Sequence, residues 1–225
     1  MEQYKQDFIE FMVRSDVLTF GNFTTKSGRD TPYFINTGNF NTGEQLLKLG
    51  YFYARAIYEN FLATSFSVIF GAAYKGIPLA AITSAQLFNS FEFDYHWCFN
   101  RKEAKDHGEG GSLVGYKPVA GDRILLIDDV ITAGTATRES IELLRREQPQ
   151  AKVIGGMISV DRMEKGLKGQ SAIQEIETEF DLDFSAIVTV DEIVAHLHNR
   201  EIDGAVVLDG DRLAAIKEYR AKYGI

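Results

Sequence analysis

Two adjacent carboxylates followed by a turn of small residues are the strongest chemical signal in the sequence. Asp128 and Asp129 come directly after the apolar run 124–127, and the small residues 132–135 follow them. Small residues let backbone N–H groups approach a ligand closely, and a helix expected from Ala136 onward adds the positive end of its dipole, so the turn suits a phosphate group. Carboxylates repel phosphate, so we interpret the two acids as acceptors for ribose hydroxyls. The pattern predicts a ribose-phosphate site.

The same segment has a purely structural alternative, in which one of the two acids is only the N-cap of the following helix. The Thr-Ala-Gly-Thr sequence after the acids favours the ligand site over this alternative. Two other classes of nucleotide enzyme are disfavoured. The sequence has neither the Gly-Lys-Ser/Thr of a nucleoside triphosphatase nor a Gly-x-Gly-x-x-Gly that opens a helix, as in dinucleotide enzymes.

The elements expected around this site alternate between strands and helices. The run 124–127 is too short for a helix and rich in branched residues, which is typical of a strand buried on both faces of a parallel sheet. The expected strands are 67–70, 95–99, 124–127, 152–160 and 184–190, and the expected helices are 3–17, 40–58, 77–91, 136–148, 191–199 and 212–222. This alternation predicts an α/β fold with a central, mainly parallel sheet flanked by helices. The polar stretch 24–36 is expected to be a connection. The C-terminal piece, the apolar run 205–208 followed by the helix 212–222, is expected to complete the sheet or cover an edge.

Composition limits the kind of protein. The chain has 225 residues, 45% of them hydrophobic, so it can bury a substantial core without disulfides. Its one cysteine, Cys98, has no intramolecular partner, and the sequence shows neither a signal-like N-terminus nor an apolar run of membrane-spanning length. A formal net charge of -8 disfavours a broad nucleic-acid surface. We therefore expect a cytoplasmic protein with no nucleic-acid or membrane partner.

The segment 100–111 is basic and ends in three glycines. By itself it is equally well explained as an exposed hairpin whose charges keep the protein soluble. Beside a ribose-phosphate site in an acidic protein, its four basic side chains instead predict a mobile lid that closes over a polyanion. The turn 71–78, which carries Lys75 between two glycines, is a weaker anion-site candidate.

Together these segments resemble the orotate phosphoribosyltransferase family over nearly the whole chain. Residues 128–136 resemble the phosphoribosyl pyrophosphate (PRPP) motif shared by the type I phosphoribosyltransferases. The Lys-Ser-Gly-Arg to Pro-Tyr-Phe segment at 26–34, the Tyr-Lys-Gly at 74–76 and the loop 101–111 resemble segments specific to the orotate enzymes. The resemblance therefore narrows the base to orotate.

The resemblance implies a fold and a reaction. The fold would be that of a type I phosphoribosyltransferase, one domain over 1–225 in which residues 1–40 form a hood and 100–111 form a mobile catalytic loop. The reaction would join N1 of orotate to the ribose of PRPP, giving orotidine 5′-monophosphate and pyrophosphate in pyrimidine biosynthesis. Mg²⁺ would be held mainly by PRPP and water, with no protein ligand. The enzyme would be a homodimer with shared active sites.

The resemblance also implies roles for individual residues. Those implied to contact PRPP are Lys26, Tyr74, Lys75, Arg101, Lys102, Lys105, His107, Asp128, Asp129, Val130, Ile131, Thr132, Ala133, Gly134, Thr135 and Ala136. Those implied to bind orotate are Lys26, Phe34, Ile35, Thr132 and Arg162, with Ile35 standing where the family often has a second aromatic residue. Those implied to act in catalysis are Lys102, Lys105, His107, Asp128 and Asp129.

Several alternatives stay open at this point. Asp128 and Asp129 could bind the ribose hydroxyls or a metal ion, and we expect mainly the former, or contact through metal-bound water. A purine or uracil phosphoribosyltransferase fits residues 128–136 but not 26–34. A PRPP-sensing transcriptional regulator would carry a DNA-binding module or a basic face and would lack the basic loop. A PRPP-synthase-like protein would need an ATP site, for which the sequence gives no sign.

Overall fold

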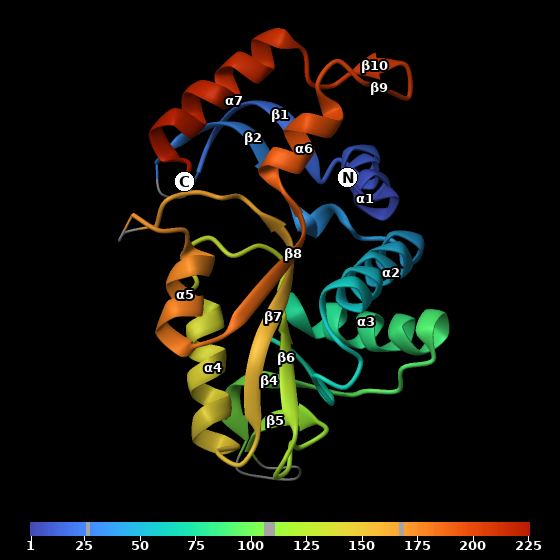
Figure 1. The fold of residues 1–225 in the computed structure, drawn as a ribbon, viewed down its shortest axis with the longest axis vertical. Coiled ribbons are helices and arrows are strands. Elements are labelled where there is room, and N and C mark those ends of the chain that lie inside the picture. Colours follow the sequence, from blue (N-terminus) through green and yellow to red (C-terminus); the bar gives the residue numbers. More distant parts are fainter. Residues whose placement is uncertain (26–27, 106–110, 167–168) are drawn as a thin grey trace.

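A six-stranded sheet forms the centre of the lower part of the molecule in Figure 1. The computed structural model describes residues 1–25, 28–105, 111–166 and 169–225, with the backbone alone at 103–105. The strand order is β5-β4-β3-β6-β7-β8, and all neighbouring pairs are parallel except β4 and β5. The strands are β3 (Val68–Gly71), β4 (His96–Lys105), β5 (Gly111–Gly115), β6 (Arg123–Ile127), β7 (Lys152–Asp161) and β8 (Asp183–Thr189). The mainly parallel sheet predicted from the sequence is thus confirmed.

Helices cover both faces of this sheet, and its strands are apolar on both sides for that reason. In β6, Leu125 and Ile127 join the core beneath α2 and α3, whereas Ile124 and Leu126 join the core beneath α4 and α5. Successive side chains of a strand point to opposite faces, so one apolar run supplies both cores. The helices are α1 (Gln3–Arg14), α2 (Gly43–Asn60), α3 (Gly76–Phe91), α4 (Thr135–Glu147), α5 (Ala172–Phe180), α6 (Val190–Leu197) and α7 (Gly210–Tyr223). None of the described helices combines the length and apolar character needed to cross a bilayer.

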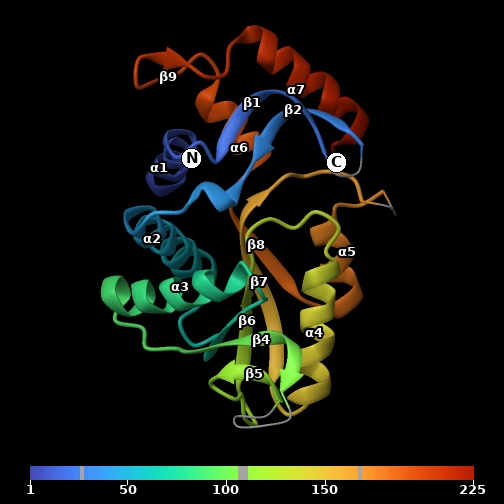
Figure 2. The ribbon, with the colours of Figure 1, turned by 180° about the vertical axis from the view of Figure 1, so that it is seen from behind.

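A separate antiparallel hairpin lies beyond the carboxyl ends of the parallel strands. Its strands are β1 (Leu18–Thr24) and β2 (Asp30–Ile35), and α7 from the other end of the sequence packs against β2. Figures 1 and 2 show the hairpin and α7 together above the main sheet. Elements from both ends of the sequence therefore cover the edge toward which β6 and β7 run.

The structure corrects four of the predicted segments. Residues 24–36 are not simply a connection, because they contain most of β2 and the end of β1. The segment 100–111 is not a loop throughout, because β4 continues to Lys105 and β5 begins at Gly111. These two strands pair as a hairpin at the base of the segment, as in the alternative interpretation of this segment as an exposed hairpin. The C-terminal piece 205–222 adds no strand to the main sheet, because β10 (Ala205–Val206) pairs with β9 (Glu201–Ile202) as a small hairpin of its own; its helix α7 packs against β2 instead. The helix predicted for 3–17 ends at Arg14.

One helix, α5, was missed by the sequence prediction although the sequence carries its start signal. Ser171 accepts a hydrogen bond from the Gln174 N–H, and the Gln174 side chain accepts from the Ser171 N–H. This is a capping box, in which two otherwise unpaired helix-terminal donors are satisfied at once. Helices α2 and α6 begin with the same motif, which explains why α2 begins at Gly43, later than predicted.

Candidate active site

The two acids lie at the carboxyl end of β6, at the edge of the sheet where α/β proteins bind ligands. The chain then turns through Gly134, whose φ of 72° is the left-handed conformation that glycine adopts readily, and α4 begins at Thr135. Gly134 is the N-cap of α4 and no side chain caps it, so the alternative in which Asp128 or Asp129 caps this helix is wrong. The acids remain available to a ligand.

A second turn, between β3 and α3, faces the first. Residues 72–75 and 128–137 line one hollow of 340 Å³. The turn is closed tightly, because a Cβ on Gly71 would lie 2.0 Å from the Gly76 carbonyl oxygen. The Asn100 side chain of β4 accepts a hydrogen bond of 2.8 Å from Ala73 N and fixes the turn from the other side. Two turns that present backbone groups and one lysine thus form the walls of this hollow.

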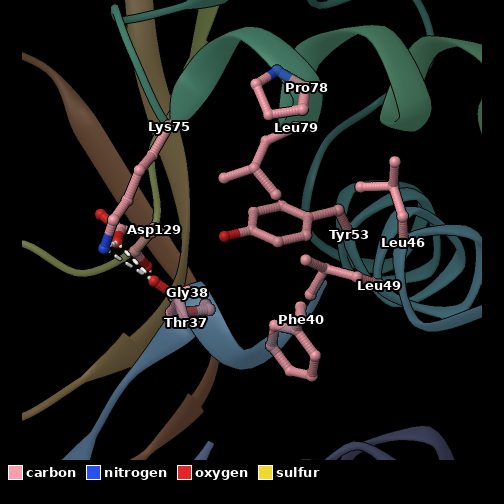
Figure 3. A pocket seen from close by; sticks show the side chains of 11 residues that line it. Thr37, Gly38, Phe40, Leu46, Leu49, Tyr53, Lys75, Pro78, Leu79 and Asp129 are labelled. Atoms are coloured by element: carbon pink, nitrogen blue, oxygen red, sulfur yellow. Dashed lines mark hydrogen bonds and ion pairs between the residues drawn. The ribbon is translucent and has the colours of Figure 1, made fainter. Parts of the chain in front are cut away.

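Asp129 is the centre of a polar cluster that joins three parts of the chain (Figure 3). Lys75 Nζ lies 2.7 Å from Asp129 Oδ2 and donates to the Thr37 hydroxyl at 3.0 Å. The same Thr37 hydroxyl donates to Asp129 Oδ2 at 2.7 Å. Thr37 comes from the short 3-10 helix Thr37–Asn39 that follows β2. The Lys75 side chain is 60% exposed and the Asp129 side chain 17%, so the lysine can leave the pair without unfolding its surroundings.

The wall behind this cluster is apolar. A pocket of 180 Å³ adjoins Asp129, and Figure 3 shows its apolar side chains on the side of α2 and α3. Its apolar lining comes from Phe40, Leu46, Leu49, Pro78 and Leu79. The Tyr53 hydroxyl at the boundary donates to the Asp128 carbonyl at 2.8 Å. This wall lowers the local polarity on one side of the acid pair.

The two neighbouring acids have opposite pKa shifts. Burial, and then the charge of Asp129, raise the pKa of Asp128 to about 7. Burial alone would raise the pKa of Asp129 as well, but hydrogen bonds from Lys75 and Thr37 outweigh it and lower that pKa. In the substrate-free protein Asp129 is therefore the charged member of the pair, and Asp128 takes up a proton near neutral pH.

The basic residues predicted around PRPP are only partly within the described residues. Lys102 Nζ lies 4.7 Å from the centroid of the Tyr74 ring, and Tyr74 is 68% exposed. Arg101 and Lys102 line a hollow next to the two phosphate turns, together with Ala73 and residues of α4. The positions of Lys26 and His107 and the side chain of Lys105 lie outside the described residues.

The residues predicted to bind orotate are brought together in part. Thr132 and Arg162 line the same small hollow beside the end of β7. Phe34 is 41% exposed and stacks on Phe23 at 5.6 Å, and the partly buried Ile35 packs against the main core. Phe34 and Ile35 are not among the described residues that line the Arg162 hollow.

Several residues that shape the site were not singled out by the sequence. They are Thr37 and Asn100 beside the phosphate turns, Tyr53 and Ser159 beneath the acid pair, and Tyr33 and Glu164 around Arg162. All of them except Glu164 act on a residue far away in sequence, so no local motif marks them; Glu164 lies two residues from Arg162 but also accepts from the distant Tyr33.

Comparison with known proteins supplies the family. The phosphoribosyl transferase domain model matches residues 36–189. The orotate phosphoribosyltransferase of Clostridium acetobutylicum is 50% identical over 225 residues, which is 100% of both chains. The chain belongs to the orotate phosphoribosyltransferase family.

Solved structures agree with this family. The crystal structure of the orotate phosphoribosyltransferase of Francisella tularensis has a TM-score of 0.84 and 39% identity, and the match covers 97% of this chain and 100% of that one. The orotate phosphoribosyltransferase of Mycobacterium tuberculosis in complex with PRPP has a TM-score of 0.58 at 18% identity, covering 84% of this chain and 98% of that one. This second match shows the shared fold alone. The type I phosphoribosyltransferase fold expected from the sequence is confirmed.

Proposed function

We propose that the protein transfers the 5-phosphoribosyl group of PRPP to N1 of orotate, giving orotidine 5′-monophosphate and pyrophosphate in pyrimidine biosynthesis. The observation that carries this proposal is the acid pair beside the phosphate turn, in a chain that matches orotate phosphoribosyltransferases over its full length. Relatives that bear this name favour orotate over a purine or uracil as the base. They also favour an enzyme over a PRPP-sensing regulator.

The geometry suggests how PRPP is held. Backbone N–H groups of residues 132–135, with the start of α4 behind them, would bind the 5′-phosphate. Asp128 and Asp129 would accept hydrogen bonds from the ribose hydroxyls, and Val130, Ile131 and Ala136 would complete the cradle. The turn 72–75 would face the pyrophosphate. Lys75 would then exchange Asp129 for the more highly charged pyrophosphate.

The chemistry depends on charge and position. As the bond between C1 and pyrophosphate breaks, positive charge grows on the ribose and negative charge grows on the leaving group. Lys75, Lys102 and Lys105 would stabilise the leaving group, and the cradle would hold C1 in line with N1 of orotate. No protein nucleophile takes part: the Cys98 thiol is buried in β4, and burial raises its pKa to about 12.

Mg²⁺ fits this site as an ion carried by the substrate. Among the described residues there is no cluster of three or more His, Cys, Asp or Glu side chains that could hold a metal ion. Mg²⁺ prefers phosphate oxygens and water to all-protein cages, and the partly exposed acid pair suits contact through water. When bound with PRPP, the ion would neutralise pyrophosphate charge. Asp128 and Asp129 would orient its water.

Further roles of the site and the subunit are part of the proposal. Arg162 and Thr132 would meet the orotate carboxylate and ring oxygens, with Lys26, Phe34 and Ile35 on the other side of the base. Residues 1–40 would act as a hood on a single domain, and 100–111, which include His107, as the catalytic loop. Two subunits would form a homodimer with shared sites.

The direct experiment is to follow the loss of orotate absorbance in the presence of PRPP and Mg²⁺, with uracil and adenine as alternative bases. We expect depletion of orotate and none of uracil or adenine. Depletion of uracil but not of orotate would assign the protein to another branch of the family.

Asn100→Ala tests whether the turn 72–75 serves PRPP. The change removes the acceptor for Ala73 N. One lost hydrogen bond costs about 1 kcal/mol, which corresponds to a rise of about fivefold in KM for PRPP. KM for orotate should stay unchanged. Steady-state kinetics at saturating orotate measure the effect. Asn60→Ala, which removes a hydrogen bond to Ala56 O at the end of α2, is the matched control.

A further inference from the structure

Residues from separate parts of the chain hold the guanidinium group of Arg162. Glu164 Oε1 accepts a hydrogen bond from Arg162 Nε at 3.0 Å and lies 2.7 Å from Nη2. The Tyr33 hydroxyl of β2 donates to the same Glu164 oxygen at 2.8 Å, and the guanidinium lies 5.1 Å from the Tyr33 ring centroid. The side chains of Arg162 and Glu164 are only 14% and 15% exposed. These contacts hold the guanidinium in one orientation.

The backbone that carries Glu164 is fixed by the segment that follows α7. Lys165 N donates to the Tyr223 carbonyl at 2.7 Å, and Ile225 N donates to the Met163 carbonyl at 3.0 Å. Between these two bonds, Glu164 forms a β-bridge with the residue after Tyr223. Residues 223–225 therefore hold residues 163–165 in place beside the end of β7.

We propose that Glu164 is a positioning residue for orotate, and that it acts by fixing the guanidinium of Arg162. This inference rests on the proposed function, in which Arg162 meets the carboxylate of orotate. The Glu164 contacts use Nε and Nη2 and not Nη1, and Arg162 lines the same hollow as Thr132, so Nη1 would donate to the substrate there. An arginine held beforehand loses less side-chain freedom when its ligand binds.

Glu164 strengthens orotate binding by orienting Arg162, but it also weakens that binding, because its negative charge repels an anionic substrate. Two variants separate the effects. Glu164→Gln keeps an acceptor for Arg162 and Tyr33 but removes the charge, whereas Glu164→Ala removes both. If orientation dominates, Glu164→Ala raises KM for orotate about tenfold and Glu164→Gln changes it less than about threefold. The KM for PRPP should not change in either variant, and kcat should fall less than about twofold.

The test is steady-state kinetics on the full-length protein, with the melting temperature of each variant measured alongside. Tyr33→Phe is a second, milder variant that removes the hydroxyl, which donates to Glu164 and also interacts with Arg162, and it should raise KM for orotate about threefold. Glu44→Ala, which removes an ion-paired glutamate of α2 far along the chain, is the matched control. An unchanged KM for orotate in both Glu164→Ala and Tyr33→Phe overturns the proposal, and so does a more than about threefold fall in KM for orotate in Glu164→Gln, because charge repulsion would then outweigh orientation.

A double-mutant cycle with Arg162→Ala distinguishes positioning from a general effect on the fold. If Glu164 acts through Arg162, the double variant has the same KM for orotate as Arg162→Ala alone. Additive losses overturn the proposal, because Glu164 would then act independently of Arg162. If Arg162→Ala itself leaves KM for orotate unchanged, the role of Arg162 fails and the inference fails with it. The proposed function fails separately if the unmodified protein does not consume orotate.

Discussion

Asp128→Asn is expected to make the substrate-free protein more stable at pH 8 and to reduce kcat/KM for PRPP about 100-fold or more. A 100-fold loss corresponds to about 3 kcal/mol, which is the free energy of hydrogen bonds to a charged acceptor. Both effects have one cause. Asp128 is buried beside Asp129, so its carboxylate is costly in the free protein. Ribose hydroxyls would be the partners that compensate this cost.

The pH dependence of stability follows from the direction of the Asp128 shift. The pKa of Asp128 rises from 3.8 to about 7 on folding. The folded protein therefore binds this proton more tightly than the unfolded chain, and the contribution of Asp128 to the free energy of unfolding falls as pH rises from about 4 to about 7. Asp128→Asn removes that slope. The gain in stability at pH 8 should be roughly 1–3 kcal/mol, because one pKa unit is worth about 1.4 kcal/mol and relaxation reduces the total.

Urea denaturation at pH 5 and pH 8 measures this effect, and Asp122→Asn is a control of opposite sign. Burial alone would raise the pKa of Asp122, but hydrogen bonds from Val119 N, Ser67 and Tyr116 outweigh it and lower that pKa. A lowered pKa contributes stability above the unfolded pKa and loses it as pH falls, so Asp122→Asn should destabilise the protein at pH 8. If both variants destabilise the protein at pH 8, the buried cost assigned to Asp128 is wrong.

The sequence was sufficient to predict the sheet and the acid pair because both depend on local patterns. The run 124–127 is apolar at every position, which only a strand covered on both faces requires, and the small residues 132–135 after Asp128 and Asp129 mark the phosphate turn. The ligand roles of these residues stay predictions. The structure adds where the residues lie.

The parts that could not be predicted depend on contacts between distant segments. Thr37 reaches Asp129 only because the hairpin of β1 and β2 returns the chain to the end of β6, and nothing near Thr37 in sequence reveals this. The position of Glu164 depends on contacts with Tyr33 and with residues 223–225, which are all distant from it in sequence. The segment 100–105 is a strand despite its charges, because it continues past the last residue of β4 that pairs with β3 and pairs only with β5, so one side of it needs no strand partner.

Lys105→Ala should lower kcat about 100-fold and have a smaller effect on PRPP binding. A charge pair about 4 Å apart is worth roughly 4 kcal/mol at an effective dielectric of 20. The positive charge of Lys105 matters most in the transition state, because negative charge grows there on the departing pyrophosphate. Lys105 is the last residue of β4, one end of the hairpin whose base contacts Tyr74 through Lys102. Pre-steady-state kinetics measure the chemical step directly. An unchanged kcat would exclude Lys105 from leaving-group stabilisation.

The same variant tests whether the loop serves the neighbouring subunit. Lys105→Ala and Asp128→Asn subunits, co-expressed in equal amounts, would form hybrid dimers in which one of two shared sites has both residues intact. Half of the dimers would be hybrids, so about one quarter of the unmodified activity should return. Co-expression of Lys105→Ala subunits with subunits that carry both Lys105→Ala and Asp128→Asn cannot form an intact site and should recover nothing. Equal activity in the two mixtures would place the loop over its own subunit's site, with the Lys102 and Tyr74 contact at its base.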